Sequence, residues 1–138
     1  MELNEALYTY LSAYTALTAL VDKRIYNDKL PDKCPFPAIA YQLVSESETE
    51  TFTQPEIDLI ASTYTFSVYA STRGDADSVS KKIRAAFKNY HGTMGGAGGV
   101  TISAIRKIPP RITDVDLTSE GAVIVYKDIQ NFEIWYNE

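Results

Sequence analysis

The segment STYTFSVYA, residues 62–70, alternates between two kinds of side chain. Tyr64, Phe66, Val68 and Ala70 lie on one side of an extended chain, and the residues on the other side are mainly hydroxylated. A period of two predicts a β-strand with one buried face and one more polar face. The apolar face of such a strand needs a second layer to cover it, so the rest of the chain must supply that layer.

Two amphipathic helices are predicted to form that layer. Apolar side chains recur at steps of three and four from Leu3 to Leu20, and again from Val79 to Tyr90. Asp75 is a suitable N-cap for the second helix. Further strands are predicted near residues 39–43, 100–108, 112–117 and 122–136, the last with a bulge or bend at KDIQN, residues 127–131. The order α-β-β-α-β-β-β predicts an α+β fold, in which two helices cover a mostly antiparallel sheet, in a single domain spanning residues 1–138.

Composition indicates a soluble cytoplasmic domain. The chain has 138 residues, of which 45% are hydrophobic and 22% charged, as is usual for soluble globular proteins. No Lys or Arg precedes Lys23, which is unlike a signal peptide, and no apolar run approaches the length of a membrane span. The single cysteine, Cys34, excludes an internal disulfide and fits a reducing compartment.

Negative charge is concentrated in the first half of the chain. Residues 1–72 contain 4 basic and 10 acidic side chains, whereas residues 73–138 contain 9 and 8. No Lys or Arg occurs between Lys33 and Arg73, and the acidic side chains of that interval are Glu46, Glu48, Glu50, Glu56 and Asp58. Proteins that bind nucleic acid through its phosphates need the opposite sign, so this surface would repel DNA. The acidic run is explained either by a solvated hairpin or loop, or by a like-charged wall that DNA passes without binding.

The glycine-rich stretch YHGTMGGAGGV, residues 90–100, contains Gly95, Gly96, Gly98 and Gly99. A phosphate-binding loop follows a strand and opens a helix, whereas this stretch follows a predicted helix and precedes a predicted strand. No lysine lies between Lys88 and Lys107, so the Walker pattern fails on residue type as well. We therefore expect a flexible helix-to-strand connection whose glycines adopt positive φ. A less favoured alternative is a small ligand-binding or regulatory module that uses residues 92–99 as a lid.

No catalytic or metal-binding group can be read from the sequence. His91 is the only histidine and follows a predicted helix, where a cation interacts favourably with the helix dipole. Cys34 lies in the proline-rich segment LPDKCPFP and is expected to be a partly buried, unreactive thiol. One His and one Cys cannot complete a zinc site, and no calcium-loop pattern occurs. A small hydrolase would need a nucleophile–base pair, so we expect no enzymatic activity, cofactor or metal.

Several loose motifs occur in a fixed order along the chain. An N-terminal helix is followed by ALTALVDKRIY, a proline-containing loop, and PAIAYQ at the start of a strand. YTFSVYASTRGDADSVSKKIRAAF then joins a strand to a helix, and VTISAIRKIPPRITDVDLTSEGAVIVYKDIQNFEIWY supplies the closing strands. In this order, over nearly the whole chain, the motifs resemble the small tail completion proteins (tail terminator and head–tail joining proteins) of long-tailed phages and prophages.

The resemblance implies a structural virion protein that forms a ring, usually a hexamer, at the head-proximal end of the tail tube. There it would stop tube growth and join the tail to the head connector. Its partners would be further copies of itself, the tail tube protein and head connector proteins, while DNA would pass through without specific binding. The implied location is the head–tail junction of the virion, with the host cytoplasm as the place of assembly.

Within such a ring, two charged sets are candidates for contacts. We expect the acidic segment Glu46–Asp58 to face the lumen or a neighbouring subunit. The basic residues of the second helix, which would pair with acids of another subunit or of the connector, are Lys81, Lys82, Arg84 and Lys88. Ordinary solvated surface explains both sets equally well.

Overall fold

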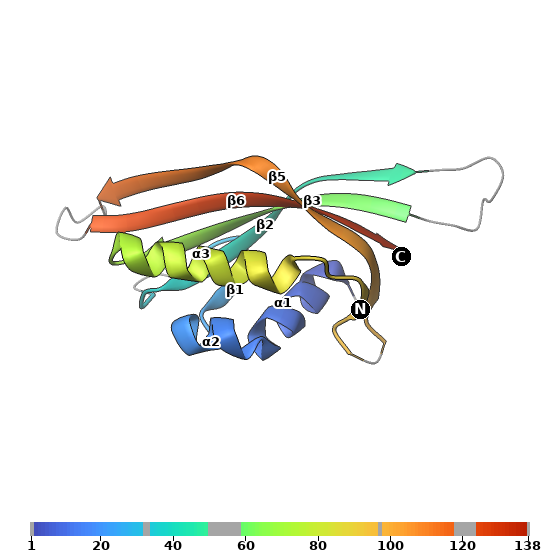
Figure 1. Ribbon diagram of the computed structural model, residues 1–138, viewed down its shortest axis with the longest axis horizontal. Coiled ribbons are helices and arrows are strands. Elements are labelled where there is room, and N and C mark those ends of the chain that lie inside the picture. The colour runs from blue at the N-terminus through green and yellow to red at the C-terminus, as the bar shows by residue number, and fades with distance from the viewer. Residues whose placement is uncertain (1, 32–33, 50–58, 97, 118–123, 138) are drawn as a thin grey trace.

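The structure, a computed structural model, describes residues 2–31, 34–49, 59–96, 98–117 and 124–137. Three helices lie against one sheet, as Figure 1 shows. The helices are α1 (Leu3–Ala13), α2 (Thr15–Val21) and α3 (Arg73–Phe87). The strands are β1 (Ile25–Asn27), β2 (Ala38–Thr49), β3 (Leu59–Ala70), β4 (Gly92–Met94), β5 (Val100–Leu117) and β6 (Ile124–Asn137). None of the described helices is long and apolar enough to cross a membrane.

The six strands form one sheet in the order β1-β2-β3-β6-β5-β4. The short strand β1 pairs with β2 in parallel, and every other pair is antiparallel. The predicted α+β class and mostly antiparallel sheet agree with this architecture. The predicted order does not, because the described chain runs α-α-β-β-β-α-β-β-β and three helices cover the sheet instead of two. Sequence patterns missed β1 and β4 because three residues are too few to show a period.

The N-terminal helix is interrupted at Tyr14. This residue has extended backbone angles and is both the C-cap of α1 and the N-cap of α2, so the single helix predicted from Leu3 to Leu20 is wrong. The reason lies in the spacing of the buried side chains. Leu3, Leu7 and Leu11 are four residues apart, whereas the next buried residue, Leu17, is six residues further on. Six residues turn a straight helix by about 240°, so only a break returns Leu17 to the sheet.

Helix α3 begins one turn earlier than its predicted cap. Its N-cap is Thr72, whose side chain accepts a hydrogen bond from the backbone N–H of Asp75 at 3.2 Å. Asp75 is therefore a first-turn acid, where its charge favours the positive end of the helix dipole. Four residues of the predicted stripe are in the core: Val79, Ile83, Ala86 and Phe87. Its last member, Tyr90, lies beyond the end of α3 at Phe87 and is only partly buried.

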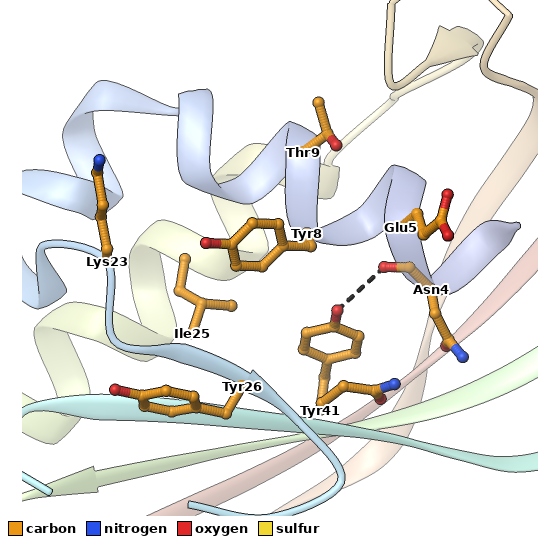
Figure 2. Close-up of a pocket in the computed structure, with 9 residues that line it drawn as sticks. Asn4, Glu5, Tyr8, Thr9, Lys23, Ile25, Tyr26 and Tyr41 are labelled. Atoms are coloured by element: carbon orange, nitrogen blue, oxygen red, sulfur yellow. Dashed lines mark hydrogen bonds between the residues drawn. The ribbon is translucent and has the colours of Figure 1, made fainter. Parts of the chain in front are cut away.

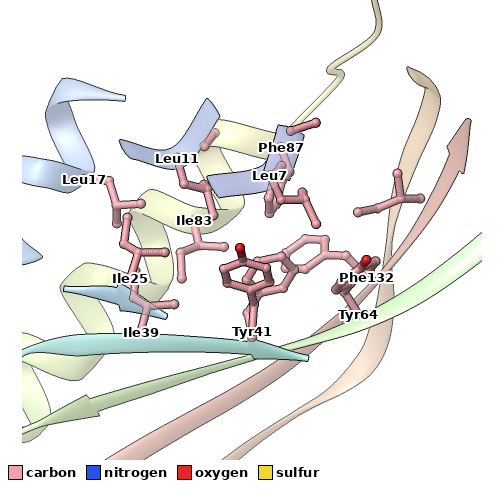
Figure 3. Packing of buried hydrophobic residues seen from close by; sticks show 14 of the residues in the cluster. Leu7, Leu11, Leu17, Ile25, Ile39, Tyr41, Tyr64, Ile83, Phe87 and Phe132 are labelled. Atoms are coloured by element: carbon pink, nitrogen blue, oxygen red, sulfur yellow. The ribbon is translucent and has the colours of Figure 1, made fainter. Parts of the chain in front are cut away.

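The core lies between the three helices and one face of the sheet, as shown in Figure 3. All four even-numbered residues predicted to be buried on β3, from Tyr64 to Ala70, are buried there. At the centre, three phenylalanines from three elements meet with ring centroids 5.1–5.6 Å apart; they are Phe66, Phe87 and Phe132. These aromatic contacts stabilise the packing of α3 against the middle of the sheet.

Strand β5 is one long strand where two had been predicted. Its residue Ile108 pairs with Asn131 of β6, and Ile112 pairs with Ile129, so four steps on β5 oppose two on β6. The two extra residues fall at Pro109-Pro110, which lack the N–H groups that a regular ladder needs. The predicted bulge in residues 127–131 of β6 is therefore wrong: the irregularity lies directly opposite, on β5.

Candidate functional site

The predicted acidic segment begins on the exposed half of β2. Glu46 is exposed and pairs in register with Ser62, and Glu48 pairs in register with Ile60. Figure 1 shows that the second half of β2 extends beyond the helices together with the first half of β3. Glu50, Glu56 and Asp58 lie outside the described residues. Glu46 and Ser47 are thus exposed on this half of β2.

The predicted basic residues of α3 divide into two pairs. Lys81 is exposed and Lys82 is half-buried, and neither lines a groove described below. Arg84 and Lys88 lie one turn apart at the end of the helix, and both border the same groove. This second pair borders the groove together with other charged residues.

That groove, which we call the basic groove, has a volume of about 350 Å³ and lies between the end of α3 and the first half of β5. Its charged lining residues are Arg84, Lys88, Arg106 and Lys107, of which Arg106 forms an ion pair with Glu133 at 3.2 Å. Its apolar floor consists of Phe87, Ile105 and Phe132. Sequence reasoning missed Arg106 and Lys107, although they are adjacent cations on a predicted strand. Which helix would lie next to that strand was not readable from the sequence.

Hydrogen bonds hold Arg84 at the rim of the basic groove. Its Nη1 donates to Gln130 Oε1 at 3.3 Å, and the same Gln130 donates through Nε2 to the carbonyl oxygen of Ser80 at 3.2 Å. Gln130 is completely buried on β6 and so cannot exchange these partners for water. The guanidinium of Arg84 is therefore fixed in position, whereas Lys88 and Lys107 are exposed at the same rim.

An ion pair joins β5 to β6 next to α3. The Asp128 carboxylate is completely buried and accepts hydrogen bonds from Nε and Nη2 of Arg111, the former at 2.7 Å. Nη2 of Arg111 also donates to Asp77 of α3 at 2.7 Å. The hydrogen bond with Asp128 is the main reason why the pKa of Arg111 is raised above its ordinary value. This cluster is structural, because Asp128 is closed off from solvent.

A second groove, of about 550 Å³, lies between α1 and β1. Figure 2 shows the rings of Tyr8, Tyr26 and Tyr41 around it, with Tyr41 donating a hydrogen bond to the carbonyl oxygen of Asn4 at 3.0 Å. Tyr8 is 41% exposed, whereas Tyr41 is buried at the base of the groove. The groove has one acid and one base at its rim, Glu5 and Lys23, and thus no strong charge preference.

Comparison with known proteins decides the family. The sequence profile of the family described as tail completion protein gp17 matches residues 5–136, nearly the whole chain. The chain belongs to this family. A solved chain described as part of the virion of a native gene transfer agent particle has a similar fold, with a TM-score of 0.61 and 14% sequence identity. The alignment covers 99% of this chain and 95% of that one. No curated protein matches the sequence.

Membership of the tail completion protein gp17 family confirms the resemblance drawn from the order of the motifs. Two of those motifs are adjacent in the structure: Nε of Arg24 donates to the carbonyl oxygen of Pro37 at 2.9 Å, and Ile25 pairs with Ile39. The motifs ALTALVDKRIY and PAIAYQ therefore meet in the fold. The family is one of structural phage proteins, so this chain is a structural protein of a phage-type virion.

In this family member the glycine-rich stretch is the turn of a hairpin. Gly92–Met94 forms β4, which pairs with the start of β5, and Met94 is completely buried. Gly95, Gly96 and Gly98 have positive φ, as expected from their predicted role. A Cβ on Gly99 would lie 2.1 Å from the carbonyl oxygen of Met94. The two grooves described above are lined by other residues, so nothing in their geometry favours the alternative of a lid.

The remaining candidates for chemistry lie apart. His91 is exposed and lies four residues beyond the end of α3, outside its last turn. Cys34 is half-buried, and its Sγ donates to the carbonyl oxygen of Pro35 at 3.4 Å. Within the described ranges, no three His, Cys, Asp or Glu side chains gather as metal ligands would.

Proposed function

We propose that this protein is a tail completion subunit that forms a closed ring at the head-proximal end of the phage tail tube. The observation that carries the proposal is the match of the tail completion protein gp17 family over residues 5–136. In that position the ring ends tube growth and presents a surface to the head connector. The ring is a hexamer, and it is made in the host cytoplasm before it becomes part of the virion.

The distribution of charge supports a ring through which DNA passes. The chain carries a net charge of −5, and no Lys or Arg occurs between Lys33 and Arg73. A lumen lined by residues of net negative charge repels phosphates and keeps DNA from adhering to the wall. The cations of the basic groove are more useful at a protein contact, where acidic groups of a neighbour can pair with them.

The test is electron microscopy of tail tubes incubated with the purified full-length chain. The expected result is a ring of density capping one end of each tube, and tubes that no longer lengthen when more tube protein is added. Tubes incubated with heat-denatured protein serve as the control. Density along the tube wall or only at the distal end, or unchanged tube growth, would overturn the proposal.

A further inference from the structure

Two strands of the sheet keep long free edges. The outer edge of β2 is covered by β1 only at residues Ile39–Tyr41, and the outer edge of β5 is covered by β4 only at Val100–Ile102. Within the described chain, no strand pairs with the outer edge of β2 beyond Tyr41 or of β5 beyond Ile102. Free edges of this length are templates for pairing with another strand.

The two free edges have opposite charge at the same level of the sheet. Glu46 of β2 pairs with Ser62, Ser62 with Ile134, and Ile134 with Ile105 of β5. The acidic stretch thus lies in one row with Ile105, which is followed by Arg106 and Lys107. Three strand spacings, about 14 Å, separate the two edges across that row. A second copy placed beside the first would bring its acidic edge level with the basic edge.

The side chains of this row, and those of the row that contains Leu43, lie on the helix-covered face of the sheet. Directly opposite residues share a face, so Leu43, Tyr64, Phe132 and Lys107 all lie on the helix side, as do Glu46 and Ile105. Leu43 is 38% exposed and Val44 is 60% exposed, so this edge presents two adjacent apolar side chains to solvent. The basic groove at the other edge has an apolar floor of Phe87, Ile105 and Phe132. Leu43 of a neighbour would lie beside that floor.

Strand directions favour the same arrangement. Because β2, β3, β6 and β5 are antiparallel in turn, β2 and β5 run in opposite directions. A copy related by rotation about a ring axis would therefore bring its β2 against β5 in antiparallel orientation, continuing the alternation. Pro109 and Pro110 lack N–H donors and end the regular part of the β5 edge after Ile108. Such a head-to-tail contact uses two different surfaces and can close into a ring.

We propose that residues 42–47 of one copy add to residues 104–108 of the next as an antiparallel strand. Leu43 lies opposite Lys107 of the neighbour, beside the floor of the basic groove. Glu46 lies opposite Ile105 and pairs diagonally with Lys107, with Lys88 nearby on the same rim. This proposal rests on the proposed function, since it describes how the ring closes. It commits the basic groove to a second copy of this chain and not to nucleic acid.

A charge exchange tests the side-chain contact. Glu46→Lys and Lys107→Glu are each expected to reduce ring formation at least tenfold, as measured by analytical ultracentrifugation and by capping of tail tubes. The double variant is expected to recover most of the loss, because it restores an opposite pair. Lys81→Glu makes the same charge change on an exposed residue outside the groove and should assemble like the original chain. Circular dichroism confirms that each variant is folded.

Disulfide trapping tests the register independently. In a Cys34→Ser background, Leu43→Cys combined with Lys107→Cys should give a ladder of covalent oligomers that ends at the ring number, because directly opposite strand residues lie within disulfide reach. Leu43→Cys with Val115→Cys, beyond the two prolines, should give none.

The outcomes separate this proposal from the proposed function. Rings that cap tubes normally in both charge-reversal variants, without cross-links at 43 and 107, would overturn the strand pairing and leave the function intact. Absence of any ring on tubes would overturn both. Loss of DNA retention in Lys107→Glu with unchanged assembly would assign the groove to nucleic acid and overturn the pairing.

Discussion

At the residue scale, two buried tyrosines, Tyr41 and Tyr64, donate hydrogen bonds to the same residue, Asn4. Tyr41 donates to the carbonyl oxygen of Asn4 at 3.0 Å and Tyr64 to its Oδ1 at 2.5 Å, which ties α1 to the sheet. Loss of hydration on burial is the largest reason why the pKa of Tyr41 is raised to about 12 and the pKa of Tyr64 is raised further. Both phenols are therefore neutral in the folded state at a pH at which unfolded tyrosines ionise.

Alkaline pH should destabilise the fold through these phenols. Because their folded pKa is raised above the unfolded value of about 10, the stability they give is complete below pH 10 and lost as pH rises toward 12. We expect the free energy of unfolding to fall by about 1.4 kcal/mol per pH unit for each phenol in this window. Urea unfolding at several pH values measures the slope, and Tyr41→Phe should reduce it. If all ten tyrosines ionise near pH 10 while the protein stays folded, the expectation fails.

The Arg111–Asp128 pair should be essential for stability although it lies outside the proposed interface. Arg111→Met would leave the carboxylate of Asp128, which is completely buried, without its cation. Uncompensated buried charges are costly, so we expect a loss of about 3–5 kcal/mol in the free energy of unfolding. Arg106→Met is the control, because Arg106 pairs with Glu133 at 3.2 Å while 71% of its side chain stays exposed. Its loss should be about 1 kcal/mol or less. Equal losses in the two variants would contradict this.

At the scale of elements, the turn between β4 and β5 depends on close packing at Gly99. A Cβ there would overlap the carbonyl oxygen of Met94, which lies on the other strand of the hairpin. We expect Gly99→Ala to cost about 1–3 kcal/mol in chemical denaturation. Gly74→Ala on α3 is the matched control, since its Cβ would meet nothing within 4 Å and alanine favours a helix. It should stabilise the protein by about 0.5 kcal/mol. A neutral Gly99→Ala would show that the hairpin is free to rearrange.

Sequence patterns predicted the elements where one face is buried over a long run. The apolar side chains of the alternating segment around Phe66 and of the helical stripe around Ile83 are in the core. Burial of one face of a strand or helix imposes this periodicity on the sequence. The break at Tyr14 was missed because Leu20 and Tyr14 continue the apolar spacing that suggested one helix. The predicted gap in β5 was wrong because an edge strand tolerates Pro109-Pro110 as a bulge and continues.

The sequence identified only part of the candidate site, for a related reason. The sequence identified Glu46 and Arg84 as charged candidates. The residues with which they form a site come from other strands. Lys107 joins Arg84 at one groove only because β5 lies at the edge beside the end of α3. Asp128, in the same way, meets Arg111 across 17 residues of sequence. Contacts of this kind follow from strand order, which one sequence without its topology does not specify.

At the scale of the whole molecule, the sheet is a strip with a different chemistry at each edge. The β2 edge presents Glu46 with Leu43 and Val44, and the β5 edge presents Lys107 beside an apolar floor. Subunits whose two sheet edges complement each other can associate side by side. A constant rotation between successive subunits then closes them into a ring. The charges set the register of the contact, while the apolar side chains supply affinity that does not depend on salt.

Assembly should therefore weaken with salt to a limited extent. Screening shortens the electrostatic range from about 10 Å at 0.1 M to about 3 Å at 1 M ionic strength, so the attraction between Glu46 and Lys107 of neighbouring copies falls. We expect the association constant of the ring to drop about tenfold over this range, as measured by sedimentation. Leu43→Ser should lower the constant at every salt concentration without changing its slope, because it removes only apolar contact. Glu46→Gln should flatten the slope. Assembly that strengthens with salt in the original chain would mean that the edges meet through apolar contact alone, and the charge register would then be wrong.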